Sequence, residues 1–143
     1  MSYFETTIKY ESLNEQSGKV ENVKENYLLK AINFSDAELQ VHKYVNENVG
    51  CIEFFIESIK RSNITEVIER PLHGISPNWF KIGIKWIQVN EKTGKETGEK
   101  TIHIVNANDF DHARAILNST FSDIVAPFEI SSITQFNLID VIS

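Results

Sequence analysis

Polar and apolar residues alternate in two stretches of the chain, one near the N-terminus and one that begins near residue 80. The positions in the buried phase of the alternation are Phe4, Thr6, Ile8 and Tyr10 in the first stretch, and Phe80, Ile82, Ile84 and Trp86 in the second. A period of two is typical of a strand with one buried face. Each stretch leads into a polar segment, 14–19 or 90–95, whose Asn and Gly tolerate positive φ. The pattern therefore predicts two β-hairpins, with return strands that end near Asn33 and Asp109.

Helical periodicity follows each predicted hairpin. The apolar positions are Ala37, Val41, Tyr44 and Val45 in the first segment, and Ala113, Ile116, Leu117 and Phe121 in the second. Ser35 and Glu38 form a candidate capping box for the first helix, and Asp109 or Asp111 can cap the second. Gly50 and Pro127 mark the ends of these segments.

Each half of the chain then closes with further apolar residues. Closing strands are predicted near 52–59 and 128–135, and a short segment of mixed polarity follows each one, at 63–68 and 137–142. A strand end and a short helical turn both remain open for these two segments.

The two halves resemble each other in sequence. A shift of 76 positions, without a gap, pairs Phe4 with Phe80, Ile8 with Ile84, Lys9 with Lys85, Asn14 with Asn90, Gly18 with Gly94, Ala31 with Ala107 and Ala37 with Ala113. After the helix the shift becomes 74, which pairs Ile59 with Ile133, Asn63 with Asn137 and Val67 with Val141. Unrelated segments share only about one residue in sixteen to twenty. The pattern therefore indicates a tandem duplication.

The predicted fold class is α+β, a tandem duplication of a ββαβ unit with two helices packed on antiparallel sheet and related by pseudo-twofold symmetry. The first repeat is predicted to span residues 1–68 and the second 79–143. The segment between them, 69–78, holds two of the three prolines and is predicted to be a linker. We expect a single domain, 1–143, in which the two repeats share one core.

Composition and charge narrow the class of protein. The chain has 143 residues, 41% of them apolar, which is enough for a globular core. The formal net charge is −6, from 14 basic and 20 acidic residues, and it weakens a general attraction to nucleic acid or anionic membranes. The single cysteine, Cys51, lies in an apolar stretch and is expected to be a small core residue. Without a secretory signal or an apolar run of membrane-spanning length, a cytoplasmic location with no membrane contact is expected.

Motifs with a known mechanism are absent from the sequence, including glycine-rich phosphate loops, HExxH, CxxC, the EF-hand loop and GxSxG. We therefore expect no enzymatic activity and no cofactor. One set of residues, His103 and His112 with Asp109 or Asp111, could converge on a metal ion, but solvated surface residues account for it more simply and no metal site is predicted.

Aromatic and basic residues on the first strand of each repeat suggest a second kind of site. Lys9, Lys81 and Lys85 lie in the strands, and Trp79 is expected on the face opposite to the buried aromatic residues. Sheets that bind single-stranded nucleic acid combine stacking aromatics with positive charge in this way. These four residues are the candidate nucleic-acid contacts, whereas Phe4, Tyr10, Phe80 and Trp86 are expected to belong to the core.

Four segments resemble a known family: Tyr3-Phe4-Glu5-Thr6, Phe34-Ser35-Asp36-Ala37-Glu38, Ile59-Lys60-Arg61-Ser62-Asn63 and Trp79-Phe80-Lys81. The family is an uncharacterised domain of unknown function of Bacteroidetes and their phages, including crAss-like phages. The resemblance covers nearly the whole chain, and its motifs are structural landmarks. It implies a bacterial or phage cytoplasm and assigns no activity or catalytic residue.

Two functions follow as expectations. The first is a non-enzymatic binding or assembly protein, phage-related or bacterial, which contacts a protein partner through its sheet and hairpins. The alternative is an accessory protein that binds single-stranded nucleic acid. The sequence assigns neither the partner nor the oligomeric state. The repeats differ at Tyr27/His103, Thr7/Gly83 and Glu11/Ile87, and these differences are where a site is expected.

Overall fold

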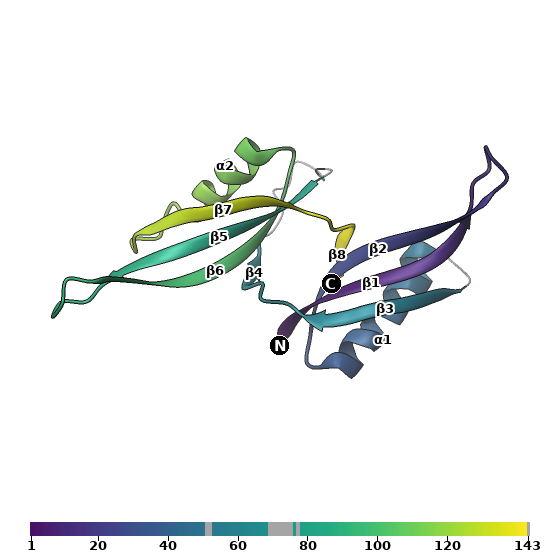
Figure 1. The fold of residues 1–143 in the computed structure, drawn as a ribbon, viewed down its shortest axis with the longest axis horizontal. Helices are drawn as coiled ribbons and strands as arrows, with labels where there is room; N and C mark the ends of the chain where they lie inside the picture. Colours follow the sequence, from purple (N-terminus) through teal and green to yellow (C-terminus); the bar gives the residue numbers. More distant parts are fainter. Residues whose placement is uncertain (51–52, 69–75, 77, 143) are drawn as a thin grey trace. The chain divides into compact units, whose positions relative to one another are not determined.

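The computed structural model describes residues 1–50, 53–68, 76 and 78–142. Within these residues the chain has a mixed α+β fold with two helices and two four-stranded sheets (Figure 1). It divides into two compact units, residues 1–62 with 138–143 and residues 63–137. Each unit is described by itself.

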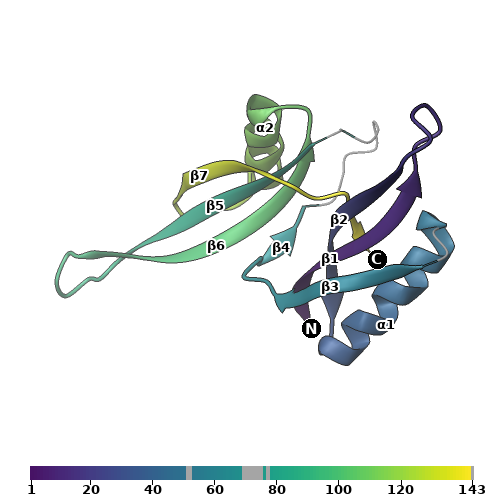
Figure 2. The same cartoon turned by 45° about the vertical axis from the view of Figure 1, so that its right-hand side comes forward.

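The first unit is built on the hairpin of β1 (Ser2–Leu13) and β2 (Val20–Ala31). The strand β3 (Phe54–Arg61) adds to β1, and β8 (Asp140–Ile142) adds to β2, which gives the order β3-β1-β2-β8. The helix α1 (Phe34–Tyr44) continues into a π-helical turn, η1 (Val45–Val49), and lies on one face of this sheet (Figure 2).

The second unit has the same kind of hairpin, formed by β5 (Asn78–Val89) and β6 (Glu96–Ala107). The strand β7 (Phe128–Phe136) pairs with β5 and the short β4 (Glu66–Val67) pairs with β6, so the order is β7-β5-β6-β4. The helix α2 (Phe110–Thr120) covers one face (Figure 2). Both predicted hairpins are confirmed, and Gly18 and Gly94 have positive φ in their turns, at 69° and 66°.

The alternating residues of the first strands face the helices, as the period of two predicted. Phe4, Ile8, Ile82 and Ile84 are fully buried and Phe80 is 2% exposed. With the helix residues they form two apolar clusters, one in each unit. The first contains Ala37, Val41 and Val45, and the second contains Ala113, Leu117 and Phe121. A core shared by the two repeats stays a prediction.

The first helix cap differs from the expected one. The side chain of Asn33, not that of Ser35, accepts the hydrogen bond from the Asp36 amide at 2.9 Å, because the helix begins two residues earlier than a Ser35 cap predicts. The Asp36 carboxylate in turn accepts from the Ile32 amide at 2.9 Å, so the Asp36 amide at the helix end and the Ile32 amide just before the helix both have acceptors. In the second unit Asp109 is the cap and accepts from the His112 amide at 2.8 Å. Gly50 ends the first helical segment with a φ of 71°.

The two short segments 63–68 and 137–142, left open between strand and helical turn, contain the strands β4 and β8. Each pairs in parallel with the hairpin of the other half of the sequence: Val67 lies opposite Ile104, and Val141 lies opposite Leu28. The chain passes between the compact units at Ser62/Asn63 and at Asn137/Leu138. Each unit therefore contains the terminal segment of the other predicted repeat.

Some predicted features lie outside the described residues. They include Cys51 and the predicted start of the first closing strand at Ile52, and most of the linker. The last residue assigned to that linker, Asn78, is the first residue of β5. Ser76 is held by Asn106, whose buried side chain accepts from the Ser76 amide and donates to the Ser76 carbonyl, both at 2.9 Å.

Candidate functional site

A hollow of about 820 Å³ lies in the first unit where the two-stranded end of its hairpin meets the end of η1 and the start of β3. It forms because β3 pairs with β1 only as far as Tyr10, so the hairpin continues beyond its third strand. Charged, polar and apolar residues line it: Lys9, Tyr10, Glu11, Ser12, Leu13, Asn22, Val49, Gly50, Glu53 and Phe55.

The most exposed large aromatic side chain of this lining is Phe55. It lies on β3 and 72% of its surface is accessible, whereas its neighbours Phe54 and Ile56 pack against the core below α1. In a strand, consecutive side chains point to opposite faces, so a run of three apolar residues must direct one away from the helix. Leu13, also in the hollow, is 62% exposed. The hollow therefore has an apolar rim that the described residues of this unit leave exposed.

Lysine residues face each other across the hairpins on the sheet faces opposite to the helices. Lys9 lies opposite Lys24 in the first unit, and Lys85 lies opposite Lys100 in the second. Like charges placed directly opposite destabilise a sheet unless an acidic group relieves them. The Glu57 carboxylate lies 3.0 Å from the Lys24 ammonium and relieves the repulsion between Lys24 and Lys9.

The structure places three of the four candidate nucleic-acid contacts together. Trp79, Lys81 and Lys85 lie on one face of β5, whereas Lys9 belongs to the first unit. Trp79 is only 4% exposed, so it presents little surface for a base to stack on. The Lys81 ammonium lies 4.7 Å from the centre of the Phe136 ring. Lys85 has Lys100 on one side and Glu129 on the other.

A polar network lies beneath the hairpin of the first unit. The Glu25 carboxylate accepts hydrogen bonds from the hydroxyls of Tyr10 and Tyr27, the latter at 2.9 Å. Burial, reinforced by Glu25, raises the pKa of Tyr27 far above its usual value. Burial, with Asp140 and Glu25, also raises the pKa of Tyr44, whose ring packs edge-on against Tyr27. The Tyr27 phenol therefore stays protonated and donates to the Glu25 carboxylate.

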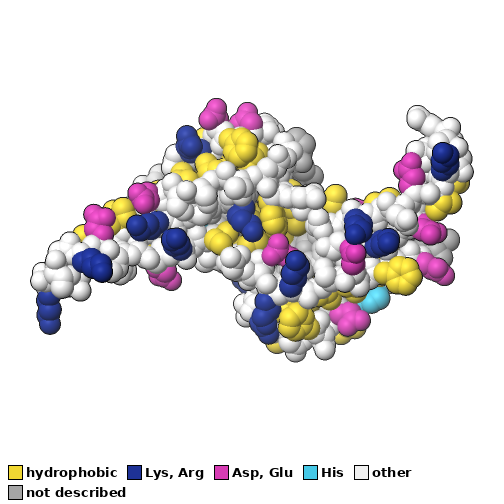
Figure 3. Space-filling view, viewed as in Figure 1, with side chains coloured by type: hydrophobic (Ala, Val, Ile, Leu, Met, Phe, Trp, Pro, Cys, Tyr) yellow, Lys and Arg dark blue, Asp and Glu magenta, His cyan; other side chains and the backbone are white. Residues whose placement is uncertain are grey.

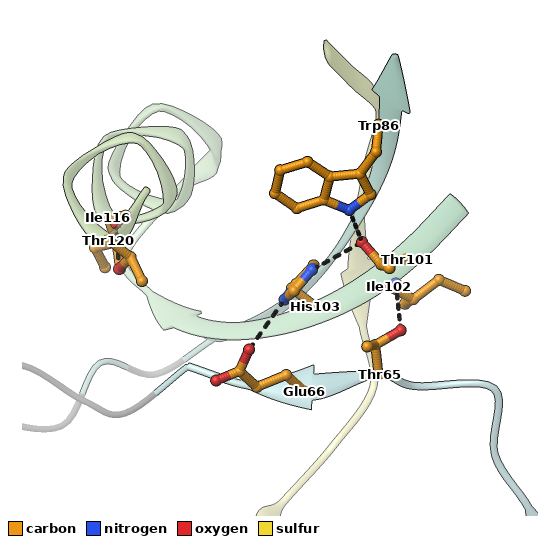
Figure 4. A network of polar contacts seen from close by, with 8 residues as sticks. All are labelled: Thr65, Glu66, Trp86, Thr101, Ile102, His103, Ile116 and Thr120. Atoms are coloured by element: carbon orange, nitrogen blue, oxygen red, sulfur yellow. Dashed lines mark hydrogen bonds and ion pairs between the residues drawn. The ribbon is translucent and has the colours of Figure 1, made fainter. Parts of the chain in front are cut away.

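The corresponding network in the second unit contains His103 in place of a tyrosine (Figure 4). Trp86 donates from its indole nitrogen to the Thr101 hydroxyl at 2.8 Å, and that hydroxyl lies 3.0 Å from Nε2 of His103. His103 is 4% exposed. Its Nδ1 has no hydrogen-bond partner among the described residues, and the nearest carboxylate oxygen, from Glu66 on β4, is 3.8 Å away.

Acidification is expected to destabilise the second unit through His103. Burial lowers the pKa of this imidazole and outweighs the opposing effect of Glu66. The unfolded chain therefore takes up the proton first, so stability is intact above about pH 6.5 and is lost as the pH falls toward the lowered pKa. The midpoint of thermal unfolding, followed by tryptophan fluorescence between about pH 7.5 and pH 5.5, should fall less for His103→Tyr than for the unchanged chain. That variant copies Tyr27, and an equal fall in both proteins contradicts the assignment.

The residues considered for a metal ion have separate partners. His112 makes two hydrogen bonds at the N-terminus of α2. Its Nδ1 accepts from the Asn108 amide at 2.9 Å, and its backbone amide donates to the Asp109 side chain. His103 belongs to the network of Trp86 and Thr101. Across the described part of the chain, no three side chains of His, Cys, Asp or Glu gather in a way that could hold a metal ion.

Another of the sequence differences has a packing explanation. At Gly83, a Cβ atom would lie 2.7 Å from Oγ of Ser132 and 3.0 Å from Oγ of Ser131, so a side chain here would collide with the serines of β7. Ser131 also donates to the Gly83 carbonyl at 3.0 Å. Gly83 therefore allows close approach of β7 to β5.

Comparison with known proteins gives the family. The sequence profile of a domain of unknown function, DUF4494, matches residues 2–143, which is nearly the whole chain. The chain belongs to the DUF4494 family. No curated protein and no solved structure matches this DUF4494 chain. None of the helices in the described ranges of the DUF4494 chain has the length and apolar character needed to cross a membrane.

Two features of this DUF4494 chain were not predicted from its sequence. Phe55 was assigned only to a closing strand, although the run Phe54-Phe55-Ile56 already required one apolar side chain to leave the core. Lys100 was not paired with Lys85, although the spacing of each from the hairpin turn sets that register.

Proposed function

We propose that the DUF4494 chain is a non-enzymatic binding protein that acts through contact with another protein. The observation that carries this proposal is the exposed Phe55 beside the hollow of the first unit. Exposed aromatic residues next to a concave surface are frequent anchors of protein interfaces, where burying a ring contributes about 2 kcal/mol or more. The resemblance to proteins of Bacteroidetes and their phages supports a bacterial or phage-infected cytoplasm as the place of action.

We also infer that the two sheets arose by duplication of a ββαβ unit. The registers support this: Lys9 lies opposite Phe55 as Lys85 lies opposite Glu129, and both closing strands carry an extra residue at the same step. Pseudo-twofold symmetry of the two copies remains part of this proposal. The correspondence supplies a matched control, because Phe55→Glu installs the residue that the second unit already accommodates.

The proposal is tested by placing a photo-crosslinking amino acid at position 55, or at position 129 as the matched control, in cells of the organism that encodes the chain. A partner should be captured from position 55 and not from position 129. The purified partner should then bind Phe55→Glu about 30-fold more weakly than the unchanged chain, as expected for loss of an interface anchor. Equal capture from both positions, or unchanged affinity, contradicts a partner site at the hollow.

The second candidate function is binding of single-stranded nucleic acid, and the lysines of the second unit favour it. Lys100 faces Lys85, and neither makes an ion pair within the described part of the chain. A phosphate group would relieve this repulsion. The mixture of charges argues against it, because lysine and acidic side chains are interspersed along the hairpin of β5 and β6 (Figure 3).

A gel-shift series with a single-stranded oligonucleotide at several salt concentrations tests this candidate. If it is correct, affinity falls steeply with salt. The double variant Lys85→Gln, Lys100→Gln should then lower the slope of the log–log plot by about 0.7 for each phosphate that the protein no longer neutralises. Absence of binding at low salt removes the candidate.

A further inference from the structure

The outer edge of β3 is unequally protected along its length. This strand ends the first sheet, and no strand of the described residues pairs with its outer side. Exposed strand edges attract further strands, and proteins protect them with charges, prolines or bulges. The second half of β3 has such protection, because Glu57 is the extra residue of the bulge and Lys60 and Arg61 follow it. The first half, Phe54–Ile56, has none.

The matching edge of the second unit is protected at this place. In β7 the residue opposite Lys85 is Glu129, whereas in β3 the residue opposite Lys9 is Phe55. A charged side chain on an edge strand discourages pairing with another strand, and an exposed apolar one favours it. The difference therefore singles out β3 as the edge at which pairing is not opposed.

The charges near Phe55 indicate which side chains a strand that pairs with this edge of β3 would carry. The ammonium of Lys24 has Glu57 as its partner, whereas Lys9 has no carboxylate partner among the described residues. In the second unit the residue opposite the corresponding lysine, Lys85, is a glutamate, Glu129, although the two form no ion pair. Glu11 and Glu53 also line the hollow, which restricts a bound carboxylate to the side of Lys9.

We propose that the occupant of the hollow is an extended segment of a partner protein that adds as a strand to the free edge of β3 at Phe54–Ile56. One apolar side chain of this segment packs against Phe55, and a carboxylate on the same face approaches Lys9. The inference rests on the proposed protein-binding function and adds the conformation and chemistry of the partner.

The spacing of strands is compatible with both contacts. Neighbouring strands lie about 4.8 Å apart, so an added strand lies about 10 Å from β1. The long side chains of Lys9 and of a glutamate can cover that separation together. Side chains on one face of a strand recur at every second position, so the apolar and acidic residues of the bound segment should be separated by one residue or by three. Main-chain hydrogen bonds to β3 would supply much of the affinity, as in other cases of strand addition.

A phage-displayed library of random twelve-residue peptides tests the inference on the full chain. Selection should enrich peptides with an apolar and an acidic residue in this spacing. Synthetic copies should bind about tenfold more weakly when alternate amides on the pairing side are N-methylated, since each removes a donor to the edge. Phe55→Glu should weaken binding about 30-fold. Replacing the acidic residue by its amide should weaken binding to the unchanged chain but not to Lys9→Met.

The outcomes separate the two proposals. If no peptide is enriched, both the protein-binding function and strand addition at β3 are contradicted. Peptides could instead be enriched and still bind equally well after N-methylation of the amides on either edge of the peptide, or bind Phe55→Glu with unchanged affinity. Either result would show that strand addition is wrong, while protein binding stands. Thermal unfolding of Phe55→Glu serves as the folding control, and the second unit shows that glutamate is accommodated at this position.

Discussion

Ile142→Asp is expected to destabilise the first unit by about 3–5 kcal/mol, although residue 142 follows the second unit in sequence. Ile142 lies on β8, is 6% exposed and belongs to the apolar cluster below α1. The substitution removes apolar burial worth about 1.5–3 kcal/mol and leaves a buried polar group without partners, at a further cost of about 1–3 kcal/mol. This is a large share of the stability of an ordinary domain.

The aromatic residues allow the two units to be followed separately. All four tyrosines, Tyr3, Tyr10, Tyr27 and Tyr44, lie in the first unit, and both tryptophans lie in the second. In urea titrations of Ile142→Asp, the tyrosine signal in near-ultraviolet circular dichroism should shift to lower urea, and tryptophan fluorescence should shift less. Ile139→Asp is the matched control, because Ile139 is 51% exposed in the same segment. A larger shift in the tryptophan signal contradicts the placement of β8.

Phe4→Ala is expected to cost about 3–5 kcal/mol, as is typical of a buried aromatic residue replaced by alanine. Phe4 is fully buried between β1 and the start of α1, where its ring meets Phe34 edge-on at 5.0 Å. The Arg61 guanidinium lies 5.2 Å from the ring centre. The cost arises from lost apolar burial and from the cavity that remains.

Phe34→Ala is the control for this prediction. Phe34 shares the edge-on contact but is 47% exposed, so its loss should cost only about 1 kcal/mol. Urea unfolding followed by the tyrosine signal measures both variants. Equal losses of stability would show that Phe4 does not have the central place in the core that its burial indicates.

Local patterns in the sequence predicted most of the elements. A period of two placed Phe4, Ile8, Ile82 and Ile84 on the buried face of their strands, because alternation is a direct consequence of strand geometry. Helical spacing placed Ala37 and Ala113 against the sheets, and both are fully buried. The predicted position of the first helix cap was wrong by two residues. Asn33 and Ser35 are both good capping residues, and only the backbone conformation decides between them.

The features that sequence patterns did not predict depend on distant pairing. Two or three residues cannot show that β8 pairs with β2, which lies more than 100 positions away, or that β4 pairs with β6. The hollow was missed for the same reason, because it needs the hairpin, the end of η1 and the start of β3 together. Of the candidate contacts, Lys81 and Lys85 lie on one strand face with Trp79, but the burial of that tryptophan depends on its surroundings in the folded chain.

Amide hydrogen exchange of Ile142→Asp and Ile68→Asp under native conditions tests most directly whether β8 belongs to the first unit and β4 to the second. Ile68 is 6% exposed and belongs to the apolar cluster below α2, as Ile142 belongs to the one below α1. We predict that Ile142→Asp lowers protection mainly in residues 1–62 and that Ile68→Asp lowers it mainly in residues 78–137. Greater loss in the half of the chain that contains each substituted residue would contradict it.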